Sequence, residues 1–189
     1  MDLGLYEHLK AGGRLVWTVP GVLTAAECAE WIARIEALKP EEAPITVRGG
    51  FERRPEVRNN DRVMFDDAGL ARRLFEAVQA TLPSTWAGRV PCGANERFRG
   101  YRYRPGQYFR SHHDGCFVRD VRERSELTLM VYLNDDFGGG ETAFESLDEV
   151  IKPVAGTALL FFHAQRHEGC SVTRGVKYVL RSDVMYREV

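Results

Sequence analysis

From residue 95 onward, apolar and polar residues alternate with a period of two, and this pattern limits the possible folds more than any other feature. Side chains of a strand point alternately to its two faces, so the alternation predicts half-buried strands. The predicted strands cover residues 97–103, 107–112, 127–133, 141–144, 158–162 and 178–186. Short strands at such spacing are typical of a sandwich or barrel. We therefore predict an α+β fold that is mainly β, with a jelly-roll core.

The first part of the chain carries helical patterns instead. Thr24 and Glu27 have the spacing of a capping box, and the apolar residues that follow recur on one helical face. That face comprises Cys28, Trp31, Ile32, Ile35 and Leu38. A second helix is predicted for residues 67–82, with an apolar stripe formed by Leu70, Leu74, Ala77 and Val78. Prolines 40 and 83 end the two helices.

The domain organisation follows from these two patterns. A short strand is expected at residues 45–48, and no linker or internal repeat interrupts the chain. We predict a single domain over residues 1–189, in which residues 1–94 form a helical support region. Residues 95–189 then form the β core.

Composition excludes several classes of protein. Hydrophobic residues make up 44% and charged residues 28% of the chain, and the formal net charge of -1 argues against a general polyanion binder. No apolar run approaches the roughly 18–20 residues that span a bilayer. Residues 1–10 lack the basic-then-apolar order of a signal peptide, and the four cysteines form no C-x-x-C pair. We therefore expect a cytoplasmic protein with reduced thiols and no membrane partner.

A histidine and an aspartate stand two positions apart at the end of a predicted strand. By strand parity, His112 and Asp114 point to one face, whereas His113 points to the other. A third ligand must come from the remaining histidines, which are His8, His163 and His167. We favour His167, with His163 as the fallback. Two imidazoles and one carboxylate on one side of a metal suit Fe(II) and leave coordination positions open for a chelating 2-oxo acid and dioxygen.

A second anchor lies on the last predicted strand. Lys177 and Arg181 share a parity there, so both could face the cavity. A buried cation is costly without an anionic partner. The far carboxylate of a bound 2-oxo acid would be such a partner.

These residues belong to an ordered series over residues 95–186. The series comprises Tyr103, Gly106, His112, Asp114, Thr128, Tyr132, Asn134, Gly139, Gly140, Thr142, Phe144, Pro153, Gly156, Leu160, Phe162, His167, Gly169, Val172, Gly175 and Lys177. It resembles the prolyl 4-hydroxylase-like branch of the 2-oxoglutarate/Fe(II) dioxygenases. The resemblance implies a double-stranded β-helix, which is a jelly-roll core with flanking N-terminal helices.

The resemblance also implies roles for single residues. His112, Asp114 and His167 would form the catalytic Fe(II) centre, and Lys177 would pair with the distal carboxylate of 2-oxoglutarate. Further candidates for contact with this co-substrate are Tyr103, Tyr132, Thr128 and Arg181. Ascorbate is the reductant that such enzymes would be expected to use. The residues after Arg181 depart from the motif of collagen-type prolyl hydroxylases, which leaves the substrate open.

Two groups of residues are candidates for substrate contact. Arg99 and Tyr101 share the parity of Tyr103, so they either face the cavity and contact substrate or form a solvated edge. A basic, polar stretch precedes the core and either borders the mouth of the site or is a solvated loop. It contains Arg53, Arg54, Arg58, Asn59, Asn60 and Arg62.

The expected function is hydroxylation of a C–H bond in a peptidyl or free amino-acid substrate, with 2-oxoglutarate and dioxygen consumed. One alternative is an AlkB-like nucleic-acid demethylase, which the near-zero net charge counts against. Another is a non-catalytic, cupin-like metal-binding protein, which the intact ligand set and Lys177 argue against. A zinc hydrolase would need a general base that is not evident beside the three ligands.

Overall fold

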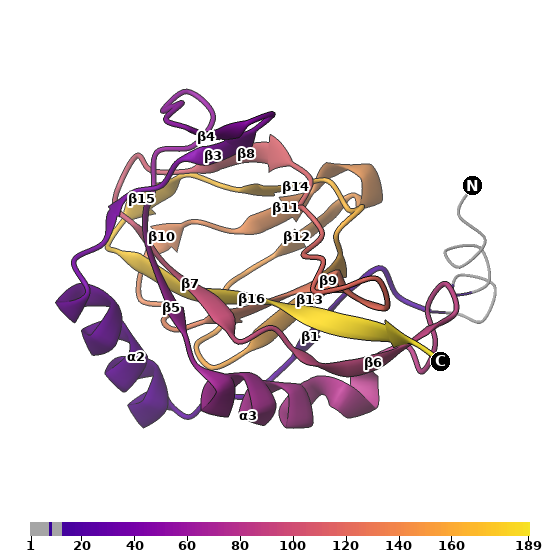
Figure 1. Ribbon diagram of the computed structural model, residues 1–189. Coiled ribbons are helices and arrows are strands. Elements are labelled where there is room, and N and C mark those ends of the chain that lie inside the picture. Colours follow the sequence, from indigo (N-terminus) through magenta and orange to yellow (C-terminus); the bar gives the residue numbers. More distant parts are fainter. Residues whose placement is uncertain (1–7, 9–12) are drawn as a thin grey trace.

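The computed structural model describes residue 8 and residues 13–189. The predicted absence of an export signal concerns residues 1–10, of which all but His8 lie outside the described part. In Figure 1, the strands form two facing layers, and helices α2 (Ala25–Ala37) and α3 (Ala68–Val78) lie against the outer side of one layer. No helix among the described residues is long and apolar enough to cross a membrane.

The major sheet has eight strands in the order β1-β13-β9-β16-β7-β5-β2, with β6 also paired to β16. Their bounds are β1 Val16–Val19, β2 Glu41–Glu42, β5 Asp61–Asp66, β6 Arg89–Ala94, β7 Arg97–Tyr103, β9 Glu123–Tyr132, β13 Ala158–Phe162 and β16 Lys177–Glu188. The strands of this sheet pair antiparallel throughout. Strand β16 lies at the centre and pairs with three neighbours, so residues on its inner face lie deep in the molecule.

The minor sheet has four strands in the order β12-β11-β14-β8. They are β8 (Phe109–His112), β11 (Thr142–Phe144), β12 (Glu149–Ile151) and β14 (His167–Gly169). Two small pairs complete the fold: the hairpin of β3 (Ile45–Val47) with β4 (Gly50–Glu52), and β10 (Gly138–Gly139) with β15 (Val172–Arg174). The minor sheet covers the face of the major sheet that is turned away from the helices (Figure 1).

Two apolar layers hold these parts together. The outer layer packs Cys28, Ile35, Leu70, Leu74 and Val78 of the helices against the major sheet. The inner layer lies between the two sheets and consists of Val16, Tyr101, Tyr103, Tyr132, Phe144, Leu159, Phe161, Val172 and Val179. Strand β13 contributes to both layers, because its five residues are all buried. The predicted mainly β, jelly-roll architecture is confirmed.

The two predicted helices are present with small differences. The capping box of Thr24 and Glu27 forms as predicted, and Cys28 and Ile35 are buried. Leu38 was predicted on the buried face but is 46% exposed, because it is the C-cap residue and lies beyond the last helical turn. In α3, Ala71 is buried in place of Ala77, and a 3₁₀ turn at residues 79–81 ends the segment.

The description of residues 1–94 as a helical support region is wrong in part. Among the described residues of this region, six short strands accompany the two helices. Four of them, β1, β2, β5 and β6, extend the major sheet. The region therefore builds part of the β core. Its strands are short and several carry charged residues, so pairing with distant strands decides their conformation more than local alternation does.

Glycine 100 shows how tightly α2 packs on the sheet. A Cβ added there would lie 2.7 Å from Cγ1 of Ile35 and 2.9 Å from Cγ2 of Val63. We expect Gly100→Ala to lower the free energy of unfolding by about 1–3 kcal/mol through overpacking. Guanidinium denaturation should show a lower midpoint at an unchanged slope. Gly93→Ala, on β6 with no atom within 4 Å of the added Cβ, is the control and should change the midpoint little.

Candidate metal centre and adjoining pocket

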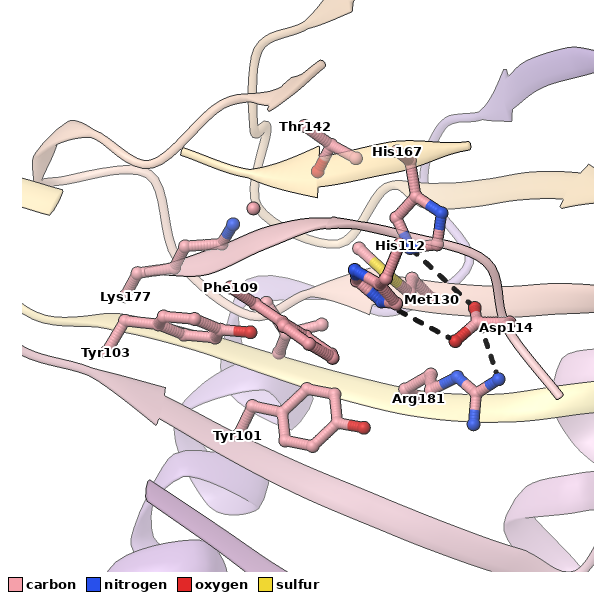
Figure 2. Close-up of a pocket in the computed structure, with 12 residues that line it drawn as sticks. Tyr101, Tyr103, Phe109, His112, Asp114, Met130, Thr142, His167, Lys177 and Arg181 are labelled. Carbon is pink, nitrogen blue, oxygen red and sulfur yellow. Dashed lines mark ion pairs between the residues drawn. The ribbon is translucent and has the colours of Figure 1, made fainter. Parts of the chain in front are cut away.

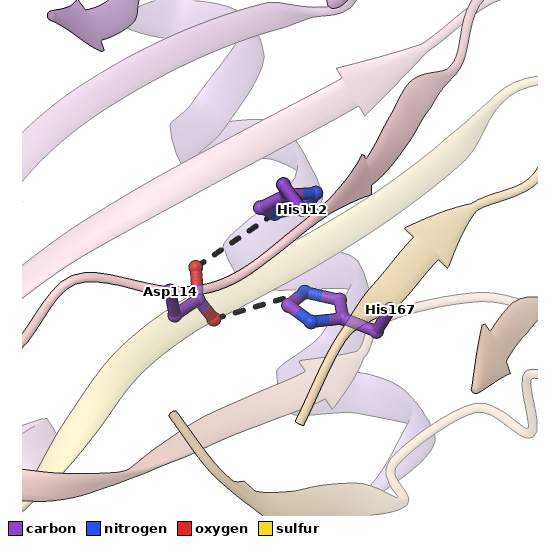
Figure 3. A group of neighbouring side chains, drawn as sticks. All are labelled: His112, Asp114 and His167. Carbon is purple, nitrogen blue, oxygen red and sulfur yellow. Dashed lines mark ion pairs between the residues drawn. The ribbon is translucent and has the colours of Figure 1, made fainter. Parts of the chain in front are cut away.

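Three side chains, two from neighbouring strands of the minor sheet and one from the loop after β8, converge on one point. His112 ends β8, Asp114 follows two residues later, and His167 begins β14. The strands pair antiparallel with His112 directly opposite His167, so the register alone brings the two imidazoles together. One ligand atom from each of the three residues lies within 4.8 Å of the others. Figure 3 shows the carboxylate of Asp114 beside the two rings, with one oxygen directed toward each.

Backbone carbonyls fix which nitrogen of each ring faces that point. Nδ1 of His112 donates to the carbonyl oxygen of Arg110 at 2.7 Å, and Nδ1 of His167 donates to that of Gln165 at 3.1 Å. A carbonyl can only accept, so both Nε2 atoms carry a free lone pair. They lie 3.8 Å and 3.7 Å from the oxygens of Asp114. This is the arrangement in which histidines bind metals.

The electrostatics favour the protonation states that a metal requires. Burial, and next the neighbouring His167, lowers the pKa of His112 to about 3, and burial lowers that of His167 as well. Burial opposes ionisation of Asp114, but Arg181 and the two histidines outweigh it and hold its pKa far below the usual range. Two neutral imidazoles and one carboxylate are therefore present at neutral pH, as metal binding requires.

Two residues hold Asp114 in place. Thr128 donates a hydrogen bond of 2.6 Å from its hydroxyl to Oδ2 of Asp114. Nη2 of Arg181 lies 3.2 Å from the same oxygen and 3.0 Å from Oδ1 of Asp183. Thr128 and Arg181 therefore contact a candidate metal ligand directly, and their predicted contact with the co-substrate stays a prediction.

The pocket beside these ligands is small, with a cavity volume of about 30 Å³. It is lined by Tyr101, Tyr103, Phe109, His112, Asp114, Met130, Thr142, His167, Gly169, Lys177, Val179 and Arg181. In Figure 2, Lys177 and Tyr103 lie on one side of the pocket and the three candidate ligands with Arg181 on the other. The predicted parity of Lys177 and Arg181 is correct, because both side chains reach this pocket.

Lys177 is a buried cation with no carboxylate within ion-pair distance among the described residues. Its Nζ donates to the carbonyl oxygen of Gly140 at 2.7 Å and lies over the rings of Tyr103 and Tyr132. Burial lowers the pKa of Lys177 to about 8. An ammonium group in such a place is ready to bind a carboxylate that enters the pocket.

Of the other predicted site residues, some line the pocket and some do not. Tyr103 and Tyr101 line the pocket, whereas Tyr132 is fully buried behind it and its hydroxyl is hydrogen-bonded to Oγ1 of Thr142 at 2.7 Å. Arg99 lies outside the lining, with Nη1 3.6 Å from Oδ2 of Asp183. His163 is engaged through both ring nitrogens by hydroxyl groups of Ser125 and Thr128, so it is not free to replace His167.

Some lining residues were not predicted as such. Thr142 and Gly169 belong to the minor sheet, and Phe109 stacks on the ring of His112 with 3.5 Å between centroids. Thr142 belongs to the ordered series that carries the family resemblance, and its parity could have placed it in the pocket. Met130 lies directly opposite Arg181 in the pairing of β9 with β16, which the sequence alone does not reveal.

Comparison with known proteins agrees with this geometry. A family model described as the 2OG-Fe(II) oxygenase superfamily matches residues 98–182. A PKHD-type hydroxylase of Caulobacter vibrioides is 31% identical over 175 residues, which cover 83% of this chain and 72% of that protein. A candidate prolyl 4-hydroxylase of Acanthamoeba polyphaga mimivirus is 32% identical over 118 residues, which cover 52% of this chain and 48% of the relative. The match therefore spans about half the length of that viral protein.

A solved structure extends the likeness over the whole fold. The viral collagen prolyl hydroxylase of Paramecium Bursaria Chlorella virus-1, solved as a 2OG complex, superposes with a TM-score of 0.67 at 25% identity. The superposition covers 94% of this chain and 98% of the viral one. The chain belongs to the 2OG-Fe(II) oxygenase superfamily. Within that superfamily, its homologues and structural neighbours are prolyl 4-hydroxylase-like.

Proposed function

We propose that this chain is a 2-oxoglutarate- and Fe(II)-dependent hydroxylase that acts on a C–H bond of a peptidyl or free amino-acid substrate, as prolyl 4-hydroxylases do. One observation carries the proposal: two neutral imidazoles and a carboxylate converge at one end of a pocket whose other end holds a buried, unpaired lysine. His112, Asp114 and His167 would hold the metal. Lys177 would hold the distal carboxylate of 2-oxoglutarate.

The donor set fits Fe(II), because two nitrogens and one carboxylate oxygen on one side suit this metal and leave room for other ligands. Bound Fe(II) with 2-oxoglutarate supplies an oxidation in which dioxygen converts the 2-oxo acid to succinate and carbon dioxide and hydroxylates a C–H bond. Thr128 and Arg181 hold the carboxylate of Asp114 beside the two imidazoles, where it would bind the metal. Apolar side chains of Phe109, Met130 and Val179 line the same pocket and exclude water from it.

Anaerobic reconstitution tests the proposal. Addition of Fe(II) and 2-oxoglutarate to the metal-free protein should produce a weak visible charge-transfer band, which reports the chelate. Peptides and amino acids containing proline are then screened in air, with ascorbate present, for substrate-dependent succinate formation. A single-stranded DNA with a methylated base is included, because turnover with it alone would assign the chain to demethylases instead. Absence of both the band and turnover would contradict the proposal.

Lys177 gives the binding of 2-oxoglutarate a defined pH dependence. Burial, partly opposed by Cys170 and Glu141, lowers the pKa of the free lysine to about 8, and a bound carboxylate would favour the charged form. The affinity should therefore be constant below this pKa and fall about tenfold for each pH unit above it, because binding must then take up a proton.

Calorimetry in buffers of different ionisation enthalpy measures that proton. With Mn(II) in place of Fe(II) to prevent turnover, we expect uptake of about 0.1 proton at pH 7 and about 0.9 at pH 9. The variant Lys177→Arg carries a permanent charge, so it should bind without proton uptake at either pH. Binding to the unmodified protein at pH 9 without proton uptake would be the contrary result.

A further inference from the structure

Four arginines gather on the cavity face of the major sheet next to the candidate metal centre. Across β5 and β7, Arg62 lies directly opposite Tyr101, and across β7 and β16, Arg99 lies directly opposite Arg181. Residues opposite each other share a face of the sheet. Tyr101 and Arg181 line the pocket, so Arg62 and Arg99 extend from the same face. Arg58, from the loop before β5, completes the group.

Arg58 is the most constrained member of this cluster. It is only 4% exposed, and its guanidinium lies over two pocket-lining rings, 4.7 Å from the centroid of Tyr101 and 4.4 Å from that of Phe109. Its Nε donates to Oδ1 of Asn60 at 2.7 Å, but its buried Nη2 has no hydrogen-bond partner. A buried donor without a partner costs free energy. An acceptor that binds to Nη2 of Arg58 would remove this cost.

The acidic residues nearby do not neutralise the cluster. Arg181 is within ion-pair distance of Asp114 and Asp183, and Arg99 shares Asp183 at 3.6 Å, where its buried Nη1 makes no hydrogen bond. No residue that the structure describes forms an ion pair with Arg58 or Arg62. Two carboxylates therefore face four guanidinium groups, and a divalent metal on Asp114 would add further positive charge.

The pKa values of Arg62 and Tyr101 are shifted in the direction that this excess of positive charge would produce. Burial, followed by Arg58, Arg99 and Arg181, lowers the pKa of Arg62. Burial acts to raise the pKa of the Tyr101 hydroxyl, but the same three arginines outweigh it and the pKa is lowered. Glu41, opposite Arg62 in the pairing of β2 with β5, is exposed and lies beyond ion-pair distance. The field around Tyr101, which itself lines the pocket, therefore attracts anions.

We propose that Arg58, Arg62 and Arg99, around Tyr101, form a subsite that binds an oxyanion of the hydroxylated substrate, either a carboxylate or a phosphate. This inference rests on the proposed function. The subsite adjoins the metal centre, because Arg58 packs on Phe109 and Phe109 stacks on His112. In Figure 2, Tyr101, at the centre of this subsite, lies on the opposite side of Tyr103 from Lys177. A substrate held there by its anionic group would present a nearby C–H bond to the metal.

Matched probes test this subsite on the protein loaded anaerobically with Fe(II) and 2-oxoglutarate. The charge-transfer band is recorded first, so failure of the chelate is seen before any probe is added. Calorimetry then compares N-acetyl-L-proline with neutral N-acetyl-L-prolinamide, and measures inorganic phosphate and acetate separately. We expect the carboxylate probe to bind at least about tenfold more tightly than the amide, a difference of about 1.4 kcal/mol.

Variants assign the preference to the cluster. Arg58→Gln and Arg99→Gln should each reduce the preference to about twofold or less, and Arg99→Gln remains informative if loss of the buried Arg58 disturbs folding. Arg97→Gln is the matched control, because Arg97 lies on the same strand but is exposed and paired with Asp66. It should retain the full preference.

The outcomes separate the two proposals. Arginine-dependent binding of phosphate, stronger than that of the carboxylates, would support the subsite and identify a phosphorylated substrate. If the band forms but no oxyanion probe shows binding that depends on Arg58 or Arg99, the subsite is refuted and the proposed function stands. If the band does not form, the proposed function fails, whatever the anions do.

Discussion

Replacement of Asp114 by alanine is expected to lower substrate-dependent succinate formation at least about a thousandfold, which corresponds to about 4 kcal/mol. Asp114 faces both imidazoles, with its oxygens 3.8 Å and 3.7 Å from their Nε2 atoms, and is the only carboxylate in the ligand group. Its loss leaves two neutral ligands, which bind Fe(II) weakly. Succinate assays and calorimetric titration with Mn(II) should show that activity and metal affinity fall together.

The same change also removes an anion that faces Arg181, so reduced stability could imitate a loss of the metal. His167→Ala separates the two effects, because it removes a ligand without changing the charge, and it should abolish turnover equally. His113→Ala is the control, since this histidine is exposed and is not one of the three candidate ligands. Full turnover in Asp114→Ala or His167→Ala would refute the ligand assignment.

Replacement of Lys177 by methionine is expected to raise the KM for 2-oxoglutarate at least about thirtyfold, because loss of one partner of a buried charge pair costs about 2–5 kcal/mol. Metal affinity should stay unchanged, since Lys177 belongs to β16 and none of the three candidate ligands does. The metal-free protein should be as stable as before or more stable. Methionine has a similar length and avoids burial of an ammonium group that has no carboxylate partner.

Three measurements test this prediction together: steady-state kinetics against 2-oxoglutarate, Mn(II) titration, and a guanidinium unfolding curve. Lys152→Met is the matched control, because Lys152 is exposed, and it should leave all three values unchanged. An unchanged KM in Lys177→Met would assign the distal carboxylate to another residue. A large loss of stability would instead indicate that Lys177 supports the fold.

The parts of the fold that could be predicted are those whose hydrophobic pattern lies within one short segment of the sequence. Strands β7 and β13 have the predicted bounds, because their alternation or continuous burial can be read from a few residues. Strand β5 was missed, because the segment Asp61–Asp66 begins and ends with aspartate and becomes a strand by pairing with β7. The three-residue β14 is too short for any periodic pattern, although it carries His167.

The candidate site was predictable for a similar reason. Parity alone placed Lys177 and Arg181 on one face, and it gave the right direction for Asp114 even though β8 ends at His112. Strand parity does not predict contacts between side chains of distant segments. The hydrogen bond from Thr128 to Asp114 and the burial of Arg58 between two rings depend on how the layers stack. The choice between a solvated loop and a pocket wall for the basic stretch therefore required the structure.

The direct pairing of His112 with His167 has a consequence for how this protein can change. Their separation is determined by the register of β8 with β14, and the length of the intervening loops does not enter it. Insertions in an exposed loop such as 115–122 would leave the ligand spacing intact, whereas one residue added inside β8 would turn an imidazole to the opposite face. Such exposed loops are therefore open to evolutionary variation and to grafting, while the pairing that positions the two imidazoles stays the same.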